Sequence, residues 1–593
     1  MIDIRRWGVF GMSAHGLPSP TSLEHLLKVE GLTVDMLKVR QPSAVLPYRN
    51  LFGHAAPNEL YQGHPDGPAS TRAMLARLAT HMKVCYPWPD FAGRPCTRDD
   101  NENIPSGYTY LAQIVAHDLV HNAGPLPRLQ DVSAHLVRDF RVNRLMLDTI
   151  YGGGPMTGPL WYERSDSPNG QRHSLRLGCV GPPGGSPGAP LVGEPTRDIG
   201  RMNCPFLSDS RDPVSSVSNT GMPDALLADP RNDDHLIISQ LTAVLHEFHN
   251  IVWTRVRPSK HVNEFSDYRA FLLVRKIVAL VFRRIVRKDL LRRLLEPGTY
   301  AYYADEGRNW PNDFLDQESD NLVPIEFSHA AYRFGHVMVR FSYRLNDKLQ
   351  NNPSIADILN RSSARRAYLL PIACDWLIDW SMFFDMGDGK RLAGLLNFSR
   401  GLRPYIAGDL SRDIFFPNED GSGGMSADGG LFYRDFVRGL EAGTRSVKSL
   451  IAKLRPHDKA RAPLLADSNY REHELGEWLK RQDRYLLPGD EPAKFTDLDR
   501  VALSQDPPLA FFVLFEAAHC QEGKRLGILG STIVAEVVFS ALARTRAIIE
   551  EDAAVVQTAE KVFGPRFPET MPDLIRFIVG SGGLASVGCS AMP

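Results

Sequence analysis

Residues 235–256, HLIISQLTAVLHEFHNIVWTRV, decide the fold class of this chain. Apolar residues recur there at three- and four-residue steps, namely at Ile238, Leu241, Leu245, Phe248 and Val252. This spacing is typical of one face of an α-helix. Similar spacing returns in many other segments, whereas the alternation typical of a strand is nearly absent. The sequence therefore predicts a mainly α protein, organised as one large helical domain with little β structure.

Further helices are expected along the chain, at 69–85, 106–122, 267–295, about 328–342, 364–381, 428–454, 472–481 and 532–548. The segment 267–295 combines an apolar stripe with many Arg and Lys residues, and we interpret it as a bundle helix with a solvated basic face. A helix lying on a membrane surface is the alternative. Between Gly152 and Asp229 the chain is dense in Gly, Pro, Ser and Asn, which predicts long surface loops.

Composition excludes several classes of protein. The 593 residues carry Lys+Arg 68 against Asp+Glu 69, so the formal net charge of -1 offers no field for attracting nucleic acid or an anionic membrane. No apolar run is long enough for a transmembrane helix, and the amino terminus lacks the apolar core of a secretory signal. We expect no nucleic-acid partner and no transmembrane segment. The cytoplasm is the default compartment, with export by another route left open.

Several histidines each have an ordinary explanation when taken alone. His246 and His249 are three residues apart, whereas the zinc-binding HExxH motif needs four. We therefore expect packing or hydrogen bonding in the core. His117 stands beside an aspartate, which happens often by chance, and His336 follows Gly335 on an apolar segment where a buried structural histidine is usual.

Taken together and in order, these segments resemble the animal-type haem peroxidase superfamily, in particular its bacterial members. The resemblance runs from about residue 46 to about 581. It implies an N-terminal extension at 1–45, a haem peroxidase domain at 46–581 and a C-terminal tail at 582–593. The segments that carry it are IPSGYTYLAQIVAHD (104–118), LDTIYGGGP (147–155), ADPRNDDHLIISQL (228–241) with HN at 249–250, IEFSHAAYRFGHVMVRFSYRLN (325–346), DWSMFFD (379–385), YRDFVRG (433–439) and KRLGILGSTIVAEVV (524–538).

The resemblance implies haem b as the cofactor and assigns residues to its two faces. His336 matches the proximal ligand of the haem iron, and Gly335 beside it leaves room where the macrocycle lies close to the backbone. On the distal face, His117 matches the distal histidine. Gln113, one helical turn earlier on the same helix face, matches the distal glutamine. Arg231 matches the catalytic arginine.

The implied activity is a peroxidase that uses hydrogen peroxide to oxidise small organic donors or halides through a ferryl intermediate. His117 would move a proton between the two peroxide oxygens, and Arg231 would offset the negative charge that develops as their bond breaks. A cyclooxygenase-like fatty-acid dioxygenase is the first alternative. It requires a tyrosine three residues before the proximal histidine, where this chain has Arg333, with Tyr332 one residue further back.

A non-catalytic haem-binding protein on the same scaffold is the second alternative, and the retained distal residues argue against it. The sequence does not determine the physiological donor, the choice between organic donors and halides, or the oligomeric state. It also leaves open what the N-terminal arm and the 152–229 loop region do.

Two positions, one beside the proximal histidine and one at the calcium site, depart from the family pattern. Asp435 in YRDFVRG stands where the family commonly has the Asn that accepts the N–H of the proximal histidine. At the usual calcium site Asp118 and Asp148 are present, but Met146 replaces an aspartate. A thioether is a poor ligand for this hard cation, so the site is degenerate and the replacement argues against calcium.

The positions that form ester links to the haem in many relatives are also changed. Ala116 has no carboxylate, so the first ester cannot form. Asp234 keeps a carboxylate but is one methylene shorter than the usual Glu, and its neighbour Asp233 is a less suitable substitute. We predict at most one ester link, through Asp234, with non-covalent haem as the favoured outcome.

Overall fold

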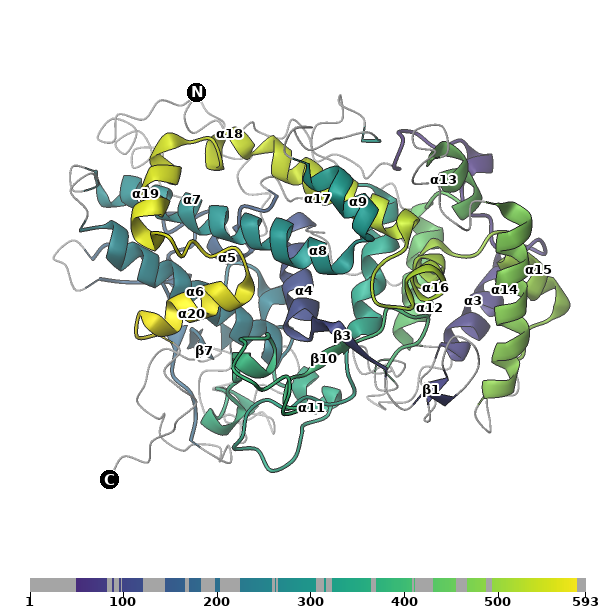
Figure 1. Ribbon diagram of the computed structural model, residues 1–593, viewed down its shortest axis with the longest axis horizontal. Coiled ribbons are helices and arrows are strands. Elements are labelled where there is room, and N and C mark those ends of the chain that lie inside the picture. Colours follow the sequence, from purple (N-terminus) through teal and green to yellow (C-terminus); the bar gives the residue numbers. More distant parts are fainter. Residues whose placement is uncertain are drawn as a thin grey trace, which may run out of the picture.

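Helix α6, Leu236–Val256, is the central element of the structure. His235 caps its N-terminus, because the imidazole accepts a hydrogen bond from the Ile238 backbone N–H. Helices α4 (Gly107–Leu119) and α7 (Asp267–Ile285) pack against it, and α6 runs beside α7 in Figure 1. Its side chains are buried nearly all round, as expected of a helix enclosed by other elements. The apolar periodicity of this segment is thus satisfied by burial on several sides.

The computed structural model describes residues 50–82, 88–89, 95–96, 99–120, 144–165, 170–182, 198–202, 224–258, 262, 265–305, 314–315, 323–363, 369–407, 410, 430–454, 467–486 and 493–583. The N-terminal extension expected at 1–45, nearly all of the tail expected at 582–593, and parts of the 152–229 region lie outside the described residues.

The mainly α architecture is confirmed. The α-helices besides those already given are α3 (Pro68–His81), α5 (Asp148–Tyr151), α8 (Leu291–Leu294), α9 (Pro297–Ala304), α10 (Ile325–Ser328), α11 (Ile355–Leu359), α12 (Gly430–Ala442), α13 (Val447–Leu454), α14 (Ser468–Gln482), α15 (Asp497–Gln505), α16 (Leu509–Gln521), α17 (Ile528–Arg544), α18 (Arg546–Ile549), α19 (Ala553–Phe563) and α20 (Met571–Gly580). The 3₁₀ helices are η2 (Pro57–Glu59), η4 (Pro159–Trp161), η6 (Pro230–Asp233), η9 (Ala331–Met338), η11 (Cys374–Trp376), η12 (Trp380–Met382) and η16 (Asp483–Tyr485), and η7 (Val286–Leu290) is a π-helical turn.

The strands of the described residues are short and pair two by two in antiparallel fashion. Strand β3 (Asp100–Pro105) leads into α4 and pairs with β10 (Phe398–Arg400), which places the start of α4 against a distant part of the chain. The others are β1 (Trp88–Pro89), β2 (Pro95–Cys96), β4 (Tyr162–Glu163), β5 (Ser174–Leu175), β6 (Leu177–Gly178), β7 (Asp198–Ile199), β8 (Arg201–Met202) and β9 (Asp224–Ala225).

The prediction of an α-helix was wrong for two segments. In the described part of 364–381 the chain forms only the turns η11 and η12, because the backbone on either side of Ala373 bonds to Gly181 instead of continuing a helix. The other segment, 328–342, forms the 3₁₀ helix η9, which ends at Met338 where the chain becomes extended at Val339. This second difference matters for the site, because side chains on a 3₁₀ helix repeat every three residues.

Two basic residues of α7 pair with acidic side chains of another segment, while Arg269 is exposed as expected of a solvated face. Lys276 Nζ lies 2.9 Å from Asp552 Oδ2, and Arg283 Nε lies 2.7 Å from Glu550 Oε1. These acidic partners belong to the C-terminal segment that carries α18 and α19, which crosses α7 in Figure 1. The apolar stripe of α7 is buried inside the protein, so it does not offer a membrane-binding surface.

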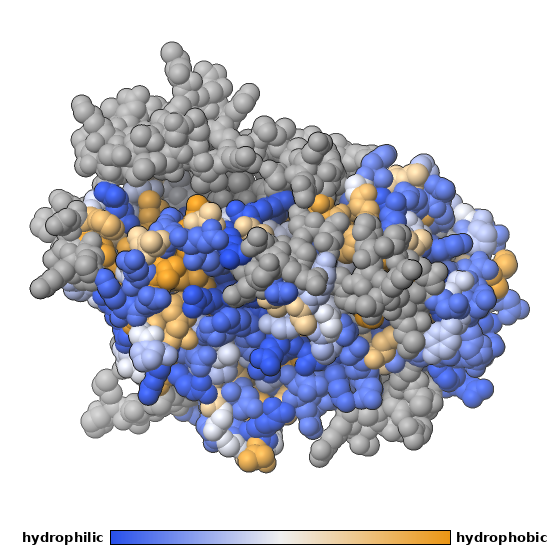
Figure 2. Space-filling model, turned by 45° about the horizontal axis from the view of Figure 1, so that its top comes forward, coloured by the Kyte–Doolittle hydropathy of each residue, from blue (hydrophilic) through white to orange (hydrophobic). Residues whose placement is uncertain are grey.

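The described part of the molecular surface is largely hydrophilic on the face shown in Figure 2, with small apolar groups scattered among polar ones. Within the described residues, no helix combines the length and the apolar character that crossing a membrane requires.

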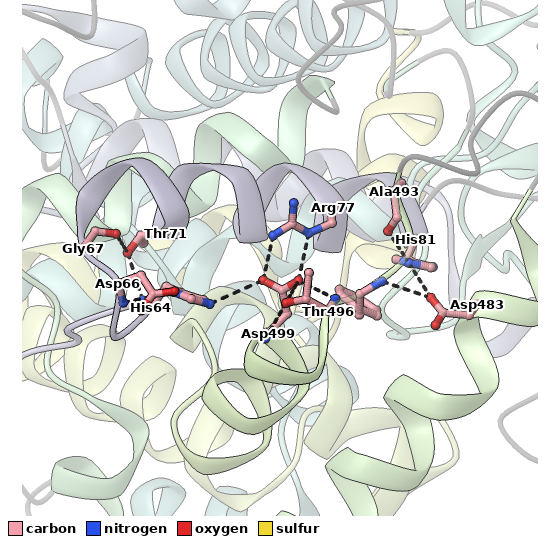
Figure 3. Close-up of polar contacts among 11 residues, drawn as sticks. His64, Asp66, Gly67, Thr71, Arg77, His81, Asp483, Ala493, Thr496 and Asp499 are labelled. Atoms are coloured by element: carbon pink, nitrogen blue, oxygen red, sulfur yellow. Dashed lines mark hydrogen bonds and ion pairs between the residues drawn. The ribbon is translucent and has the colours of Figure 1, made fainter.

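Helices α3 and α15 are joined by a buried ion pair at the opposite end of the molecule from α19 and α20 (Figures 1 and 3). Arg77 donates to both oxygens of Asp499, from Nε at 2.9 Å and from Nη2 at 2.8 Å. The same carboxylate accepts from the Thr496 backbone N–H at 2.7 Å and so caps α15. His64 Nε2 lies 3.9 Å from the other carboxylate oxygen, Asp499 Oδ1. The Asp499 side chain is fully buried and that of Arg77 is 22% exposed, so the carboxylate is shielded from solvent.

Replacing Asp499 by Ala is expected to lower the free energy of unfolding by about 3–5 kcal/mol, because the change leaves the Arg77 guanidinium without its counter-charge. Asp497→Ala on the same helix is the matched control, since that side chain is fully exposed and should have no measurable effect. Urea unfolding followed by circular dichroism measures both. Equal effects of the two substitutions would contradict the assignment.

The same pair predicts a pH dependence. Burial alone raises the pKa of Asp499, but hydrogen bonds from Arg77 and Thr496 outweigh it and hold that pKa below its ordinary value. The stabilisation is therefore present at neutral pH and is lost as the pH falls through the lowered pKa. The difference between wild type and Asp499→Ala should shrink in acid, below about pH 4.

Candidate active site

Helix α4 carries the expected distal residues, and its position is set by close packing at its first turn. A Cβ at Gly107 would come within 2.4 Å of the Phe384 ring, so only glycine lets this ring lie against the helix. Tyr108 donates a 2.7 Å hydrogen bond to Asp289 Oδ2 on η7. The SGY sequence at the start of this segment thus serves to dock α4, and it holds the later turns in place.

His117 lies in the last turn of α4, and its partner is on η6. Its Nδ1 is 2.9 Å from Oδ1 of Asn232, which is fully buried. The Asn232 amide nitrogen donates to Thr149 on α5, to the carbonyl oxygen at 3.2 Å and to Oγ1 at 2.9 Å. Sequence reasoning missed Asn232 and Thr149, although both lie inside segments that carried the resemblance.

Gln113 lies one turn before His117, as predicted, and is held by His235. Because His235 Nδ1 accepts from the Ile238 N–H at 3.3 Å, the proton of the neutral ring is on Nε2. Nε2–H therefore donates to Gln113 Oε1 at 3.0 Å. Sequence reasoning also missed His235, and the available signal was its place directly before an apolar helix, where a cap is expected.

Arg231 belongs to η6, and its guanidinium lies at the C-terminal end of α4. It donates to the carbonyl oxygens of His117 (2.8 Å) and Val120 (2.9 Å), where a cation is favourable. It also pairs with Asp229 through Nη2 at 2.7 Å. The guanidinium therefore joins η6 to the end of the distal helix. Its expected action on peroxide stays a prediction.

His336 lies on η9, and its Nδ1 is 2.7 Å from Oδ2 of Asp435 on α12. Burial alone raises the pKa of Asp435, but the charges of His336, Arg333 and Arg438 outweigh it and hold that pKa below its ordinary value. The carboxylate is therefore ionised at neutral pH and accepts the Nδ1–H. This leaves Nε2 as the nitrogen that can bind iron.

The surroundings of His336 fit a haem on this side. A Cβ built at Gly335 would meet no atom within 4 Å, so there is open space beside the backbone where the macrocycle is expected. The His336 side chain is 29% exposed, although its hydrogen-bond partner Asp435 is almost fully buried. The residues present therefore fit a group that binds Nε2 and covers Gly335.

The proximal and distal elements pack against each other, because η9 contacts α4. Tyr332 connects them, since its hydroxyl donates to the Ala112 carbonyl oxygen at 3.3 Å. Three residues before His336, where the dioxygenase alternative needs a tyrosine, Arg333 lies with Nη1 3.8 Å from Asp435 Oδ1. A 3₁₀ helix has three residues per turn, so Arg333 lies on the same helix face as His336. Tyr332 is rotated from that face by about a third of a turn.

The two aspartates that remain at the degenerate calcium site are engaged by protein groups. Asp118 accepts hydrogen bonds from the backbone N–H of Leu147 at 2.8 Å and of Thr149 at 3.1 Å. Asp148 forms an ion pair with Arg275. Calcium needs six to eight oxygen ligands, and a guanidinium beside these carboxylates does not fit that need. Among the described residues, no group of three or more His, Cys, Asp or Glu side chains is placed to hold a metal ion.

Removal of calcium with EGTA is accordingly expected to leave the thermal unfolding midpoint unchanged, because Arg275 supplies the positive charge near Asp148. Substitution of Arg275 by Met should lower that midpoint, since it leaves Asp148 without its partner. Differential scanning calorimetry measures both. A midpoint that falls with EGTA and recovers with added Ca²⁺ would show that a calcium site exists.

The positions considered for haem esters lie on α4 and at the end of η6. Ala116 lies on α4, and Asp234 follows η6 directly. Asp233 is buried and pairs with Arg201, with Oδ1 2.9 Å from Nη2, so its carboxylate is already committed. A link through Asp234 stays a prediction.

The histidines of α6 are structural, as expected. Burial lowers the pKa of His246 to about 4 and that of His249 to about 3, so both rings are neutral. His246 Nδ1 lies 2.9 Å from the Arg176 carbonyl oxygen, and His249 Nε2 lies 2.9 Å from that of His173. They hold the β5 region of the loop against α6.

Comparisons with known proteins agree with the resemblance to haem peroxidases. The family model for animal haem peroxidase matches residues 191–371, a range that includes Arg231 and His336. Among solved structures, Peroxidase A from Dictyostelium discoideum superposes with a TM-score of 0.56 at 14% identity, over 92% of this chain and 96% of that one. The fatty acid alpha-dioxygenase of Arabidopsis thaliana gives 0.51 at 13% identity, over 92% and 80%.

A curated relative, "Heme peroxidase 2" of Caenorhabditis elegans, is 30% identical over 116 residues. That match covers 19% of this chain and only 16% of the relative's length. The fold is the one shared by haem peroxidases and related dioxygenases. The family match over residues 191–371, together with this fold, confirms the resemblance to animal haem peroxidases. The relatives named are eukaryotic, and a bacterial origin stays an expectation.

Proposed function

We propose that this protein is a haem b peroxidase that uses hydrogen peroxide to oxidise small organic donors or halides. One observation carries the proposal: two histidines on packed elements have their Nδ1 atoms held by different partners. Nδ1 of His336 is bound by the ionised carboxylate of Asp435, and that of His117 by the neutral amide of Asn232. A strongly held, basic imidazole suits an iron ligand, and a neutral one beside a glutamine suits proton transfer.

On the proximal side, His336 would bind the haem iron through Nε2, with Asp435 holding the ring. When bound, haem supplies the redox chemistry by which peroxide is reduced and a donor oxidised. Gly335 would leave room for the macrocycle. This side therefore orients the cofactor and tunes the ligand that holds it.

On the distal side, His117 would accept a proton from the inner oxygen of hydrogen peroxide and return it to the outer oxygen, so that water leaves. Gln113, whose Oε1 accepts from His235, would present its amide N–H groups to the peroxide or to a water molecule. Arg231 would contribute a positive charge beside the His117 backbone, partly offset by Asp229.

The dioxygenase alternative has less support from this site. Its tyrosine position is filled by Arg333, and the hydroxyl of Tyr332 contacts the backbone of α4. The likeness to a plant fatty acid alpha-dioxygenase is one of fold.

The experiment that tests the proposal uses the full chain reconstituted with haem b. A Soret band that changes on adding hydrogen peroxide, together with turnover of a phenolic donor or bromide, is expected. Absence of a Soret band would overturn the proposal. A Soret band without any reaction with peroxide would favour a non-catalytic haem-binding protein. Sustained oxygen uptake with a polyunsaturated fatty acid would favour the dioxygenase.

Replacing Asp435 by Asn is expected to raise the Fe(III)/Fe(II) reduction potential by several tens of millivolts. The ionised carboxylate gives the His336 ring more imidazolate character, which favours the higher oxidation state. A hydrogen bond to a charged group is stronger than one to a neutral group by about 1 kcal/mol. For a one-electron couple, a tenfold change in the equilibrium constant corresponds to about 59 mV, so a difference of this size is several tens of millivolts. Spectroelectrochemical titration measures the shift. A fall in potential, or none, would contradict the contact or its charge.

A further inference from the structure

The orientation of the Asn232 side chain is decided by its partner Thr149. The buried amide group lies 3.2 Å from the Thr149 carbonyl oxygen and 2.9 Å from Thr149 Oγ1. A carbonyl oxygen accepts hydrogen bonds and never donates them, so the amide atom facing it is the nitrogen. The amide oxygen of Asn232 therefore faces Nδ1 of His117, at 2.9 Å.

This orientation determines the tautomer of His117. Because Oδ1 of Asn232 can only accept, Nδ1 of His117 carries the hydrogen, and in the neutral ring Nε2 holds the lone pair. We propose that Asn232, fixed by Thr149, is a positioning residue that selects Nε2 of His117 as the proton-accepting atom of the site. The use of that atom rests on the proposed function, whereas the tautomer is a property of the chain itself.

The arrangement is held from the other end by Asp118. The Thr149 backbone N–H donates to Asp118 Oδ1 at 3.1 Å, and Leu147 N–H donates to its other oxygen at 2.8 Å. Asp118 is fully buried and follows His117 on α4. The hydrogen bonds therefore form a closed ring. Asp118 of α4 binds Thr149, Thr149 binds Asn232, and Asn232 binds His117, which is again on α4. This carboxylate of the degenerate calcium site holds Thr149, the residue that orients Asn232.

Gln113, the other distal residue on α4, is also oriented by a hydrogen-bonded partner. His235, three residues after Asn232, accepts the Ile238 N–H at Nδ1 and so donates from Nε2 to Gln113 Oε1. The junction between η6 and α6 thus sets a donor or acceptor direction for Gln113 as well as for His117. This second arrangement is independent of Thr149, which makes it a useful internal reference.

The first test measures the tautomer directly, without haem and without turnover. In ¹⁵N-histidine-labelled full-length protein, the His117 signals are identified by their loss in His117→Gln. The wild type is expected to show the hydrogen on Nδ1. Asn232→Leu should produce a mixture containing the Nε2–H form, and Asn232→Asp, which keeps an acceptor oxygen, should retain Nδ1–H. A wild-type ring protonated at Nε2, or a tautomer unchanged in Asn232→Leu, would overturn the proposal.

The second test measures cyanide binding to the ferric, haem-loaded protein, in which hydrogen cyanide must give up its proton to a distal base. Asn232→Leu is expected to slow association by about tenfold or more, because fewer molecules present an unprotonated Nε2. Thr149→Val keeps the carbonyl acceptor that orients Asn232, and should change the rate far less. Equal rates in wild type and Asn232→Leu, at equal haem content, would contradict the proposal.

The two tests separate this inference from the proposed function. If the wild type has the predicted tautomer but its haem-loaded form does not react with peroxide, the tautomer assignment stands and the peroxidase proposal fails. If peroxide reacts but the tautomer is Nε2–H, the assignment to Asn232 fails alone.

Discussion

Replacing His117 by Gln should slow the first spectral change on mixing the haem-loaded protein with hydrogen peroxide by about 10²–10⁴-fold, the usual contribution of a general acid–base group. Glutamine is similar in size and polar, but at neutral pH it does not accept and return a proton. Haem content should stay near that of the wild type, because His117 lies on α4 and is not expected to bind the iron. Stopped-flow absorbance at the Soret band measures the rate.

His246→Gln is the matched control for this prediction. It also replaces a buried histidine by glutamine, but on α6, where the ring bonds to the Arg176 carbonyl oxygen. Its peroxide rate should match that of the wild type. If His117→Gln loses as much haem as a proximal variant does, the assignment of His117 to the distal face is wrong.

Replacing His336 by Ala should weaken haem binding by more than about 10–100-fold, the effect usually seen when only a group supporting a metal ligand is lost. Without the imidazole, the iron loses its expected protein ligand, and Asp435 is left buried beside the vacated space. The ratio of haem to protein after gel filtration measures retention, and the Soret spectrum reports any change of ligand.

His329→Gln is the control for the proximal side, since it lies in the same segment seven residues earlier and bonds to Ser328. Burial is the main reason that the pKa of His329 falls to about 3, so this ring is neutral and structural. The His329 variant should keep its haem. Loss of haem from both variants would indicate general disruption of η9, and retention of haem by His336→Ala would show that another residue binds the iron.

Much of the fold could be predicted from the sequence, because helices depend on spacing within short stretches. The apolar steps of 235–256 identified α6, and those of 106–122 identified α4. The failure at 364–381 has a tertiary cause, since the backbone around Ala373 bonds to Gly181, far away in the chain. The π-helical turn inside 267–295 was likewise not predicted, because the analysis of apolar spacing assumes a single helical period.

The site divides in the same way. The sequence by itself determined the order of the segments and the residue types at His117, Gln113, Arg231 and His336, because these are local motifs. Only the tertiary structure decided most of their partners, since these come from distant segments, whereas Asp229 is two residues from Arg231. Asn232 is 115 positions from His117, and Asp435 is 99 from His336.

The tertiary contacts also changed what some residues are expected to do. From the sequence Asp118 and Asp148 were candidates for calcium, yet one orders backbone N–H groups and the other pairs with Arg275. From the sequence His235 was only a residue before a helix, yet it bonds to Gln113. A local pattern specifies which groups a segment offers, whereas hydrogen-bond direction and charge pairing depend on which segments meet in the folded chain.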